Sequence, residues 1–226
     1  MNDKPHYAGH RSRLRRRFMK SGGDAIADYE MLELVLFLSQ ARRDMKPTAK
    51  ALLERFGSFA DAISAEPREL KEVEGVGDAA VVAMKTVREA ALRLSRDGVM
   101  NKHVLSSWQD LMDYLRAGMA FDKTERFRIL YLNRKNALIA DEVQQKGTVD
   151  HTPVYPREVV KRALELNATA IIMVHNHPSG DPTPSQDDIE MTEEVRDAGE
   201  KLGIALHDHV IISKKDHYSF KSNGLL

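Results

Sequence analysis

Two histidines follow a short apolar run in the C-terminal part of the chain. Residues 170–174 read Ala-Ile-Ile-Met-Val, and His175 and His177 come next, separated by one asparagine. In an extended backbone, residues i and i+2 project to the same side, so both imidazoles would face one point. Three prolines and a glycine within residues 178–184 then favour a turn away from the sheet.

A serine and an aspartate lie at the predicted start of the next helix. Ser185 suits the N-cap position, and Asp188 falls in the first helical turn. If the loop folds back, Asp188 comes beside the two imidazoles. Two neutral nitrogens and one carboxylate make a three-ligand zinc site with room for a water molecule, whose pKa the metal lowers towards about 7. Such a site also needs a general base.

Each of these features has a plainer interpretation. A His-x-His pair is most often two ordinary strand or surface histidines, and Ser185 with Asp188 makes a normal helix N-terminus. The helix cap does not exclude metal binding. The combination of a buried strand, two histidines, a turn-forming loop and Ser-x-x-Asp is more specific than its parts, and it favours a metal site.

The elements that must position these residues alternate between strand and helix. We predict strands at 127–133, 137–143, 170–174 and 204–212, a hairpin turn at 133–136, and helices at 106–117, 156–166 and 185–202. This alternation indicates an α/β domain. The first hundred residues show helical spacing instead, at 29–38, 49–56 and 79–94. A linker at 97–102 would separate a helical module, residues 1–98, from the α/β domain, residues 104–226.

Composition excludes several classes of protein. The 226 residues are 42% hydrophobic and carry 34 basic and 34 acidic side chains, which suits a globular core and excludes a disordered or fibrous chain. The absence of cysteine excludes disulfides, thiolate zinc sites and cysteine nucleophiles. No run approaches the roughly 18 apolar residues of a membrane helix, and no apolar signal region follows the N-terminus. We therefore expect a cytoplasmic protein without a membrane partner.

The whole string from His175 to Asp188 resembles the JAMM (MPN-type) metalloprotease motif. Together with Tyr-Pro-Arg-Glu at 155–158, and with residues 9–14 and 49–58, it resembles the bacterial RadC family, also called UPF0758. The resemblance implies a JAMM/MPN domain with a mixed sheet flanked by helices. It also implies a zinc-dependent hydrolase, a metallopeptidase or isopeptidase acting on a peptide or protein substrate.

The resemblance also implies roles for individual residues. His175, His177 and Asp188 match the zinc ligands, and Ser185 matches the residue that hydrogen-bonds the developing oxyanion. We align the upstream glutamate of the motif, the general base, to Glu142. Asp141 is adjacent, and a slip of one residue along a strand would put the carboxylate on the opposite face of the sheet.

A second His-x-His pair lies in the last predicted strand, at His207 and His209. These histidines could be an alternative ligand pair, or one could orient a ligand from behind. We favour a polar strand end near the site, with His209 as a neighbour and not a ligand.

Residues 66–94 resemble a helix-hairpin-helix, in which Gly75 and Gly77 permit a tight turn whose amides can face a DNA phosphate. The nearby acidic side chains of Glu72, Glu74 and Asp78 weaken such binding. A basic run at 10–17 could supply positive charge, which makes Arg15, Arg16 and Arg17 candidate DNA contacts. The alternative function is thus a DNA-associated, repair-type protein whose zinc domain acts on nucleic acid or only binds. A structural hairpin and a solvated helix face are the plainer interpretations.

Overall fold

The computed structural model describes residues 9–146 and 154–226, and the chain divides into two compact units. Unit 1 ends at Ala91, and unit 2 extends from Leu92 to Leu226. The boundary falls inside helix α6 (Asp78–Val99), which continues five residues beyond its predicted end at Leu94. Within the described residues, no helix is both long enough and apolar enough to cross a membrane.

The described residues of unit 1 form helices and no strands, as predicted. Its elements are α1 (His10–Ser21), η1 (Gly23–Ala25), α2 (Asp28–Leu36), α3 (Lys46–Phe56), α4 (Phe59–Ser64), α5 (Pro67–Lys71) and the first part of α6. Leucines of α2 and α3 occupy one continuous core with apolar residues of α4, α5 and α6. α3 ends at Gly57, whose φ of 92° suits a residue without a side chain.

Unit 2 is built on a five-stranded mixed sheet. The strands are β1 (Arg126–Leu132), β2 (Leu138–Lys146), β3 (Ala170–Asn176), β4 (Ala205–Ile212) and β5 (His217–Ser219), in the order β2-β1-β3-β4-β5. Only the pair β3 and β4 is parallel, and α9 (Gln186–Glu200) connects these two strands. The predicted fold class, an α/β domain with a mixed sheet flanked by helices, is confirmed.

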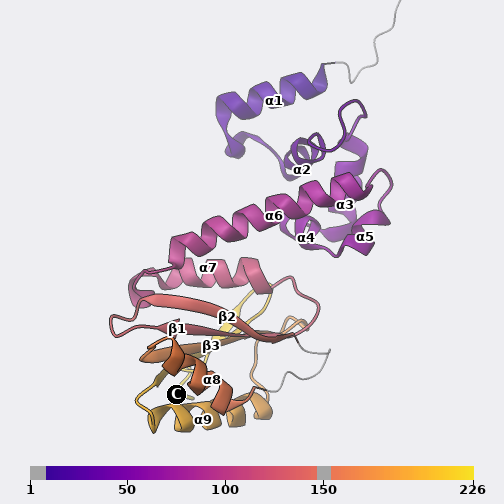
Figure 1. Ribbon diagram of the computed structural model, residues 1–226. Coiled ribbons are helices and arrows are strands. Elements are labelled where there is room, and N and C mark those ends of the chain that lie inside the picture. Colours follow the sequence, from indigo (N-terminus) through magenta and orange to yellow (C-terminus); the bar gives the residue numbers. More distant parts are fainter. Residues whose placement is uncertain (1–8, 147–153) are drawn as a thin grey trace, which may run out of the picture. The chain divides into compact units, whose positions relative to one another are not determined.

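Helices cover both faces of the sheet (Figure 1). On one face, η2 (Val104–Ser107) and α7 (Trp108–Met119) pack against Leu130, Ile172 and Val174. On the other face, α8 (Pro156–Glu165) and α9 cover Ile129, Ile171 and Met173. All seven residues of β3 are buried, as expected for a strand with helices on both sides.

The register of the central strands determines which residues meet at the edge of the sheet. β1 and β3 are antiparallel, with Phe127 opposite His175. The start of β1 therefore lies beside the end of β3, where the two histidines are. Since side chains alternate between faces, His175 shares a face with Phe127 and Met173, which is the face covered by α8 and α9.

Candidate functional site

Three side chains converge at the end of β3 and the start of α9. Nε2 of His175 lies 3.0 Å from Nε2 of His177 and 3.1 Å from Oδ1 of Asp188. Nε2 of His177 lies 3.7 Å from Oδ2 of the same carboxylate. Ligands about 2.0 Å from a tetrahedral zinc ion are about 3.3 Å apart. The three donor atoms thus have the spacing and the chemistry of a divalent metal site. Within the described residues, His175, His177 and Asp188 form a group that could hold a metal ion.

The loop between β3 and α9 orients two of these side chains. The Nδ1 of His177 lies 2.8 Å from the backbone carbonyl oxygen of Asp181, which can only accept a hydrogen bond. In the neutral ring, Nδ1 therefore carries the hydrogen and Nε2 has the lone pair. Ser185 caps α9 by accepting from the Asp188 backbone amide. Its backbone amide and hydroxyl donate to Oδ2 of Asp188, which leaves Oδ1 directed at His175.

Asp188 and His177 shift each other's pKa values. Burial raises the pKa of Asp188, but the neighbouring imidazoles of His175 and His177 and the hydrogen bond from Ser185 outweigh burial and hold that pKa well below its usual range. Burial lowers the pKa of His177, but the Asp188 hydrogen bond and the Asp181 carbonyl outweigh it and raise the pKa above its ordinary value of 6.5. A carboxylate held ionised beside two imidazole nitrogens is suited to bind a cation.

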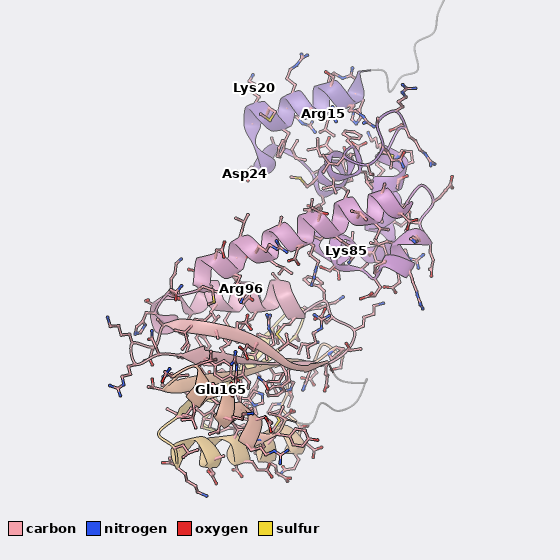
Figure 2. All side chains as sticks on the ribbon, in the orientation of Figure 1. Arg15, Lys20, Asp24, Lys85, Arg96 and Glu165 are labelled. Carbon is pink, nitrogen blue, oxygen red and sulfur yellow. The ribbon has the colours of Figure 1, made fainter. Side chains whose placement is uncertain are left out.

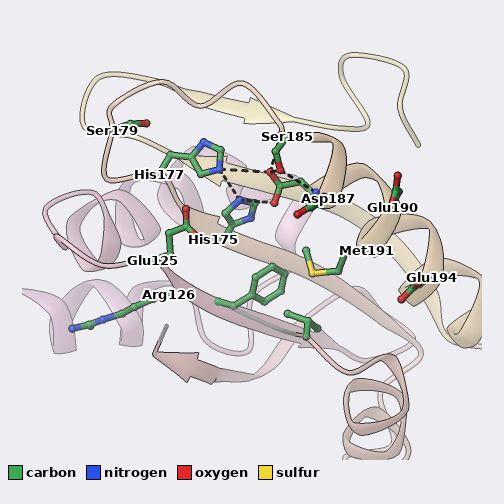
Figure 3. A pocket seen from close by; sticks show the side chains of 13 residues that line it. Glu125, Arg126, His175, His177, Ser179, Ser185, Asp187, Glu190, Met191 and Glu194 are labelled. Atoms are coloured by element: carbon green, nitrogen blue, oxygen red, sulfur yellow. Dashed lines mark hydrogen bonds and ion pairs between the residues drawn. The ribbon is translucent and has the colours of Figure 1, made fainter. Parts of the chain in front are cut away.

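The group opens onto a cavity of about 560 Å³ that His175, His177, Ser185 and Asp188 line together (Figure 3). Further acidic side chains line the same cavity: Glu125, Asp187, Glu190 and Glu194. The basic side chain in the lining, Arg126, points away from the histidines in Figure 3 and pairs with Asp122. The surroundings of the three potential ligands are therefore acidic and accessible.

Glu142, the predicted general base, is not brought to this group. It lies opposite Ile129 and so shares the face of the sheet with His175, but it is on the outer strand β2. Its carboxylate accepts three hydrogen bonds of 2.6–3.1 Å from Arg162 of α8, and these bonds lower its pKa. Glu142 is not among the residues that line the cavity. The structure thus differs from the predicted convergence of four residues, because β1 lies between β2 and the histidines.

Asp141, the other candidate from the one-residue alternative, lies on the opposite face of the sheet. Its Oδ2 accepts a 2.5 Å hydrogen bond from the hydroxyl of Tyr114 and a 2.9 Å bond from Arg128. These partners belong to α7 and β1, on the side away from His175 and the other candidate ligands. The expected reversal of faces between neighbouring strand residues is therefore observed.

Sequence reasoning missed Glu125, the residue just before β1. The β1–β3 register, continued by two residues, places it level with His177. Figure 3 shows its side chain beside the two imidazoles, and its negative charge helps to raise the pKa of His177. Only the antiparallel pairing of β1 with β3 could have indicated Glu125, since nothing in its local sequence marks it.

Asn176 holds the backbone on both sides of Glu125. Its Oδ1 accepts a 2.8 Å hydrogen bond from the amide of Arg126, and its Nδ2 donates a 3.2 Å bond to the carbonyl of Thr124. The side chain is 1% exposed. The asparagine between the two histidines thus continues the β1–β3 ladder with its side chain and positions the glutamate that faces the site.

The second pair of histidines divides between two places. His207 lines a separate cavity of about 230 Å³ near Trp108, and its Nε2 lies 2.8 Å from Oδ1 of Asn136. His209 is completely buried behind the metal-ligand group, with its Nε2 2.8 Å from Nδ1 of His175. His209 is therefore in contact with a candidate ligand, and burial holds its pKa well below 6.5.

The candidate DNA contacts lie in unit 1, where several already have partners. Arg17 pairs with the buried Glu30, and the guanidinium of Arg15, labelled in Figure 2, lies 5.8 Å from the centre of the Phe37 ring. Arg16 is exposed. These contacts show that α1 uses part of its basic run to pack against α2.

The predicted hairpin joins α5 to α6 through residues 72–77, with Gly75 at a φ of 89°. The neighbouring acidic residues are paired with bases: Arg55 with Glu72, Arg43 with Glu74, and Lys71 with Asp78. Lys85 of α6, labelled in Figure 2, donates to the carbonyls of residues 63–65 at the end of α4. DNA binding by Gly75, Gly77 and the arginines stays a prediction.

Comparison with known proteins agrees with this geometry. Residues 105–225 match the family model described as a RadC-like JAB domain. A UPF0758 protein of Rhodobacter capsulatus is 58% identical over 213 residues, which cover 94% of this chain and 100% of the relative. A UPF0758 protein of Ruegeria pomeroyi is 57% identical over 217 residues, 96% of this chain and 97% of the relative. The chain therefore belongs to the RadC-like JAB domain family, as its resemblance to RadC and UPF0758 predicted.

Proposed function

We propose that the protein is a zinc-dependent hydrolase that cleaves amide bonds in a peptide or protein substrate. The observation that carries the proposal is the convergence of two imidazole nitrogens and a carboxylate oxygen, 3.0–3.7 Å apart, on an accessible cavity. A structural zinc site is normally closed by four protein ligands, whereas a catalytic site has three and an open position. When bound, zinc supplies an activated water and stabilises negative charge on a substrate carbonyl oxygen.

Glu125 is the carboxylate that best suits the general base. It would accept a proton from the attacking water and pass it to the leaving nitrogen of the substrate. Its place in the cavity lining beside the histidines supports this role, and the two hydrogen bonds from Asn176 to its neighbours favour a fixed position. Glu142 would first have to leave Arg162, which already satisfies its oxygens.

Ser185 would donate a hydrogen bond to the carbonyl oxygen as charge develops there. Its hydroxyl lies in the cavity lining and donates 2.6 Å to Asp188. With Asp188 engaged as a metal ligand, the Ser185 hydroxyl would be released to turn towards the substrate.

The charge of the cavity favours a peptide over a nucleic acid as substrate. Four carboxylates line it in addition to Asp188, and its arginine pairs with Asp122. A phosphodiester would bring its own negative charge into this field and be repelled, whereas an amide group is neutral. The same argument disfavours the alternative in which the zinc domain acts on nucleic acid.

The test compares three glutamine variants of the zinc-loaded protein against a panel of peptides and isopeptides. Glu125→Gln should keep its zinc and lose hydrolysis by about 10²–10⁴-fold. Glu142→Gln should retain activity, and so should the matched control Glu194→Gln, which removes a carboxylate from the same cavity. Full activity in Glu125→Gln with loss in Glu142→Gln would reverse the assignment. A wild-type protein that binds no zinc would contradict the proposal itself.

A further inference from the structure

A chain of buried hydrogen bonds leads from His175 away from the cavity. Nδ1 of His175 lies 2.8 Å from Nε2 of His209, and Nδ1 of His209 lies 2.6 Å from the hydroxyl oxygen of Thr192. That hydroxyl donates a 2.5 Å bond to the backbone carbonyl of Asp188. The three side chains are 3%, 0% and 1% exposed, so water does not compete for these bonds. The chain links β3 to α9 through β4.

The carbonyl at the end determines the direction of every bond in the chain. A carbonyl oxygen cannot donate, so the hydroxyl of Thr192 gives its only hydrogen to Asp188 and must accept from His209. Complete burial favours the neutral form of His209, which then carries the hydrogen facing Thr192 on Nδ1 and has its lone pair on Nε2. That lone pair can only accept, so the bond to His175 comes from the Nδ1–H of His175.

With its hydrogen on Nδ1, the neutral ring of His175 has its lone pair on Nε2. Nε2 is the atom 3.0 Å from His177 and 3.1 Å from Asp188, so it faces the metal position. We propose that Thr192 and His209 are positioning residues that hold His175 in the tautomer and orientation that bind a metal through Nε2. The inference rests on the metal site of the proposed function, and it does not depend on hydrolysis or on the substrate.

The surroundings of the two rings support a fixed orientation. Phe127 stacks on His175 with ring centres 5.5 Å apart, and Phe220 stacks on His209 at 4.6 Å. These apolar faces offer no competing hydrogen-bond partner to either imidazole. His175 and His177 are thus oriented by different means, since a loop carbonyl accepts the hydrogen bond from Nδ1 of His177.

The chain ends on the backbone of Asp188, which is itself a candidate ligand. Because the Thr192 hydroxyl bonds the carbonyl four residues earlier in the same helix, the direction of the chain is determined as soon as α9 forms. The orientation of one ligand is in this way coupled to the helix that carries another.

The test uses Thr192→Val, which keeps the shape of the side chain and removes the hydroxyl. His209 then loses its acceptor and can carry its hydrogen on Nε2, which would move the hydrogen of His175 to the metal-binding nitrogen. We expect zinc affinity, measured by competition with a chromophoric chelator, to fall 10- to 100-fold. Thr192→Ser should restore it to within about threefold, since the hydroxyl remains.

A matched control is available in unit 1. Thr48 is also a buried threonine, 4% exposed, whose hydroxyl donates to a backbone carbonyl, that of Glu74. Thr48→Val makes the same chemical change away from the candidate site and should leave zinc affinity unchanged. An equal loss of affinity in both variants would overturn the inference, because it would indicate a general effect of the substitution.

A second measurement needs no metal. In the metal-free protein with ¹⁵N-labelled histidine, NMR should show hydrogen on Nδ1 of His175 in wild type and its absence from Nδ1 in Thr192→Val. An unchanged tautomer, or wild-type zinc affinity in Thr192→Val, would overturn the inference. If wild type binds no zinc, the proposed function fails while the tautomer still decides this inference. Should Thr192→Val not fold, His209→Gln, whose amide oxygen can accept from His175, tests the same bond.

Discussion

Metal binding should stabilise unit 2 against heat by an amount that depends on His175. A ligand at 100 times its dissociation constant adds about 2.7 kcal/mol to the free energy of unfolding. For a domain of the size of unit 2, Leu92–Leu226, each kcal/mol raises the melting temperature by about 3–4 °C. Zinc at that concentration should therefore raise the melting temperature of wild type by about 10 °C.

The His175→Ala variant removes one of the three donor atoms, Nε2 of His175, which lies closest to both others. If its zinc affinity falls 1000-fold, the same zinc concentration adds less than about 0.1 kcal/mol, a shift below about 1 °C. The comparison uses the difference between chelator-treated and zinc-loaded samples of each variant. The cost of the mutation to the metal-free protein therefore cancels.

Differential scanning calorimetry with parallel metal analysis is the measurement. His207→Ala is the matched control, since this histidine lies two residues from His209 but contacts Asn136 in another cavity. It should keep the full zinc-induced shift. An equal shift in His175→Ala and wild type, or loss of the shift only in His207→Ala, would refute the assignment of the ligands.

Three further predictions concern pH, the base and unit 1. Because the pKa of His177 is raised above 6.5, this residue contributes fully to the stability of the metal-free protein below pH 6.5, and the contribution is lost as pH rises through the raised pKa. Zinc affinity should increase over the same interval, because zinc must displace the proton from His177. Denaturation and chelator competition from about pH 6.5 to 8.5 measure both pH dependences, which should flatten in Asp188→Asn. Asn176→Ala removes both bonds that flank Glu125 and should lower kcat about tenfold or more with KM and zinc content unchanged, and a further loss in the Glu125→Gln background would contradict this role. Arg17→Ala leaves the buried carboxylate of Glu30 without its cation and should destabilise unit 1 by about 1–3 kcal/mol, whereas the exposed Arg16→Ala should cost less than about 0.5 kcal/mol in urea denaturation.

The candidate site separates into a local part and a part that depends on pairing. His175, His177, Ser185 and Asp188 lie within fourteen residues, and the geometry among them follows from strand alternation and a helix cap. Their convergence could be predicted because each step involves neighbours in the chain. The fold class could be predicted for the same reason, since periodicity marks each strand and helix by itself.

The position of Glu142 relative to the histidines could not be predicted from the sequence. Since Asp141 and Glu142 are neighbours in a strand, only one of them can share the sheet face of the histidines. The alternation of side chains does put Glu142 on that face. The order of strands was not visible in the sequence. β1 separates β2 from β3, so the carboxylate beside the histidines comes from the start of β1.

The sequence by itself determined the family, the two-part organisation into helical and α/β regions, and a candidate metal-binding motif with its helix cap. Only the tertiary structure decided that Glu125 faces the site and that Glu142 is hydrogen-bonded to Arg162. It also decided that His209 and Thr192 form a hydrogen-bonded chain with His175. These residues are brought together by the pairing of β1, β3 and β4 and by the packing of α8 and α9 on one face. Pairing order depends on contacts distant along the chain, and local spacing does not encode them.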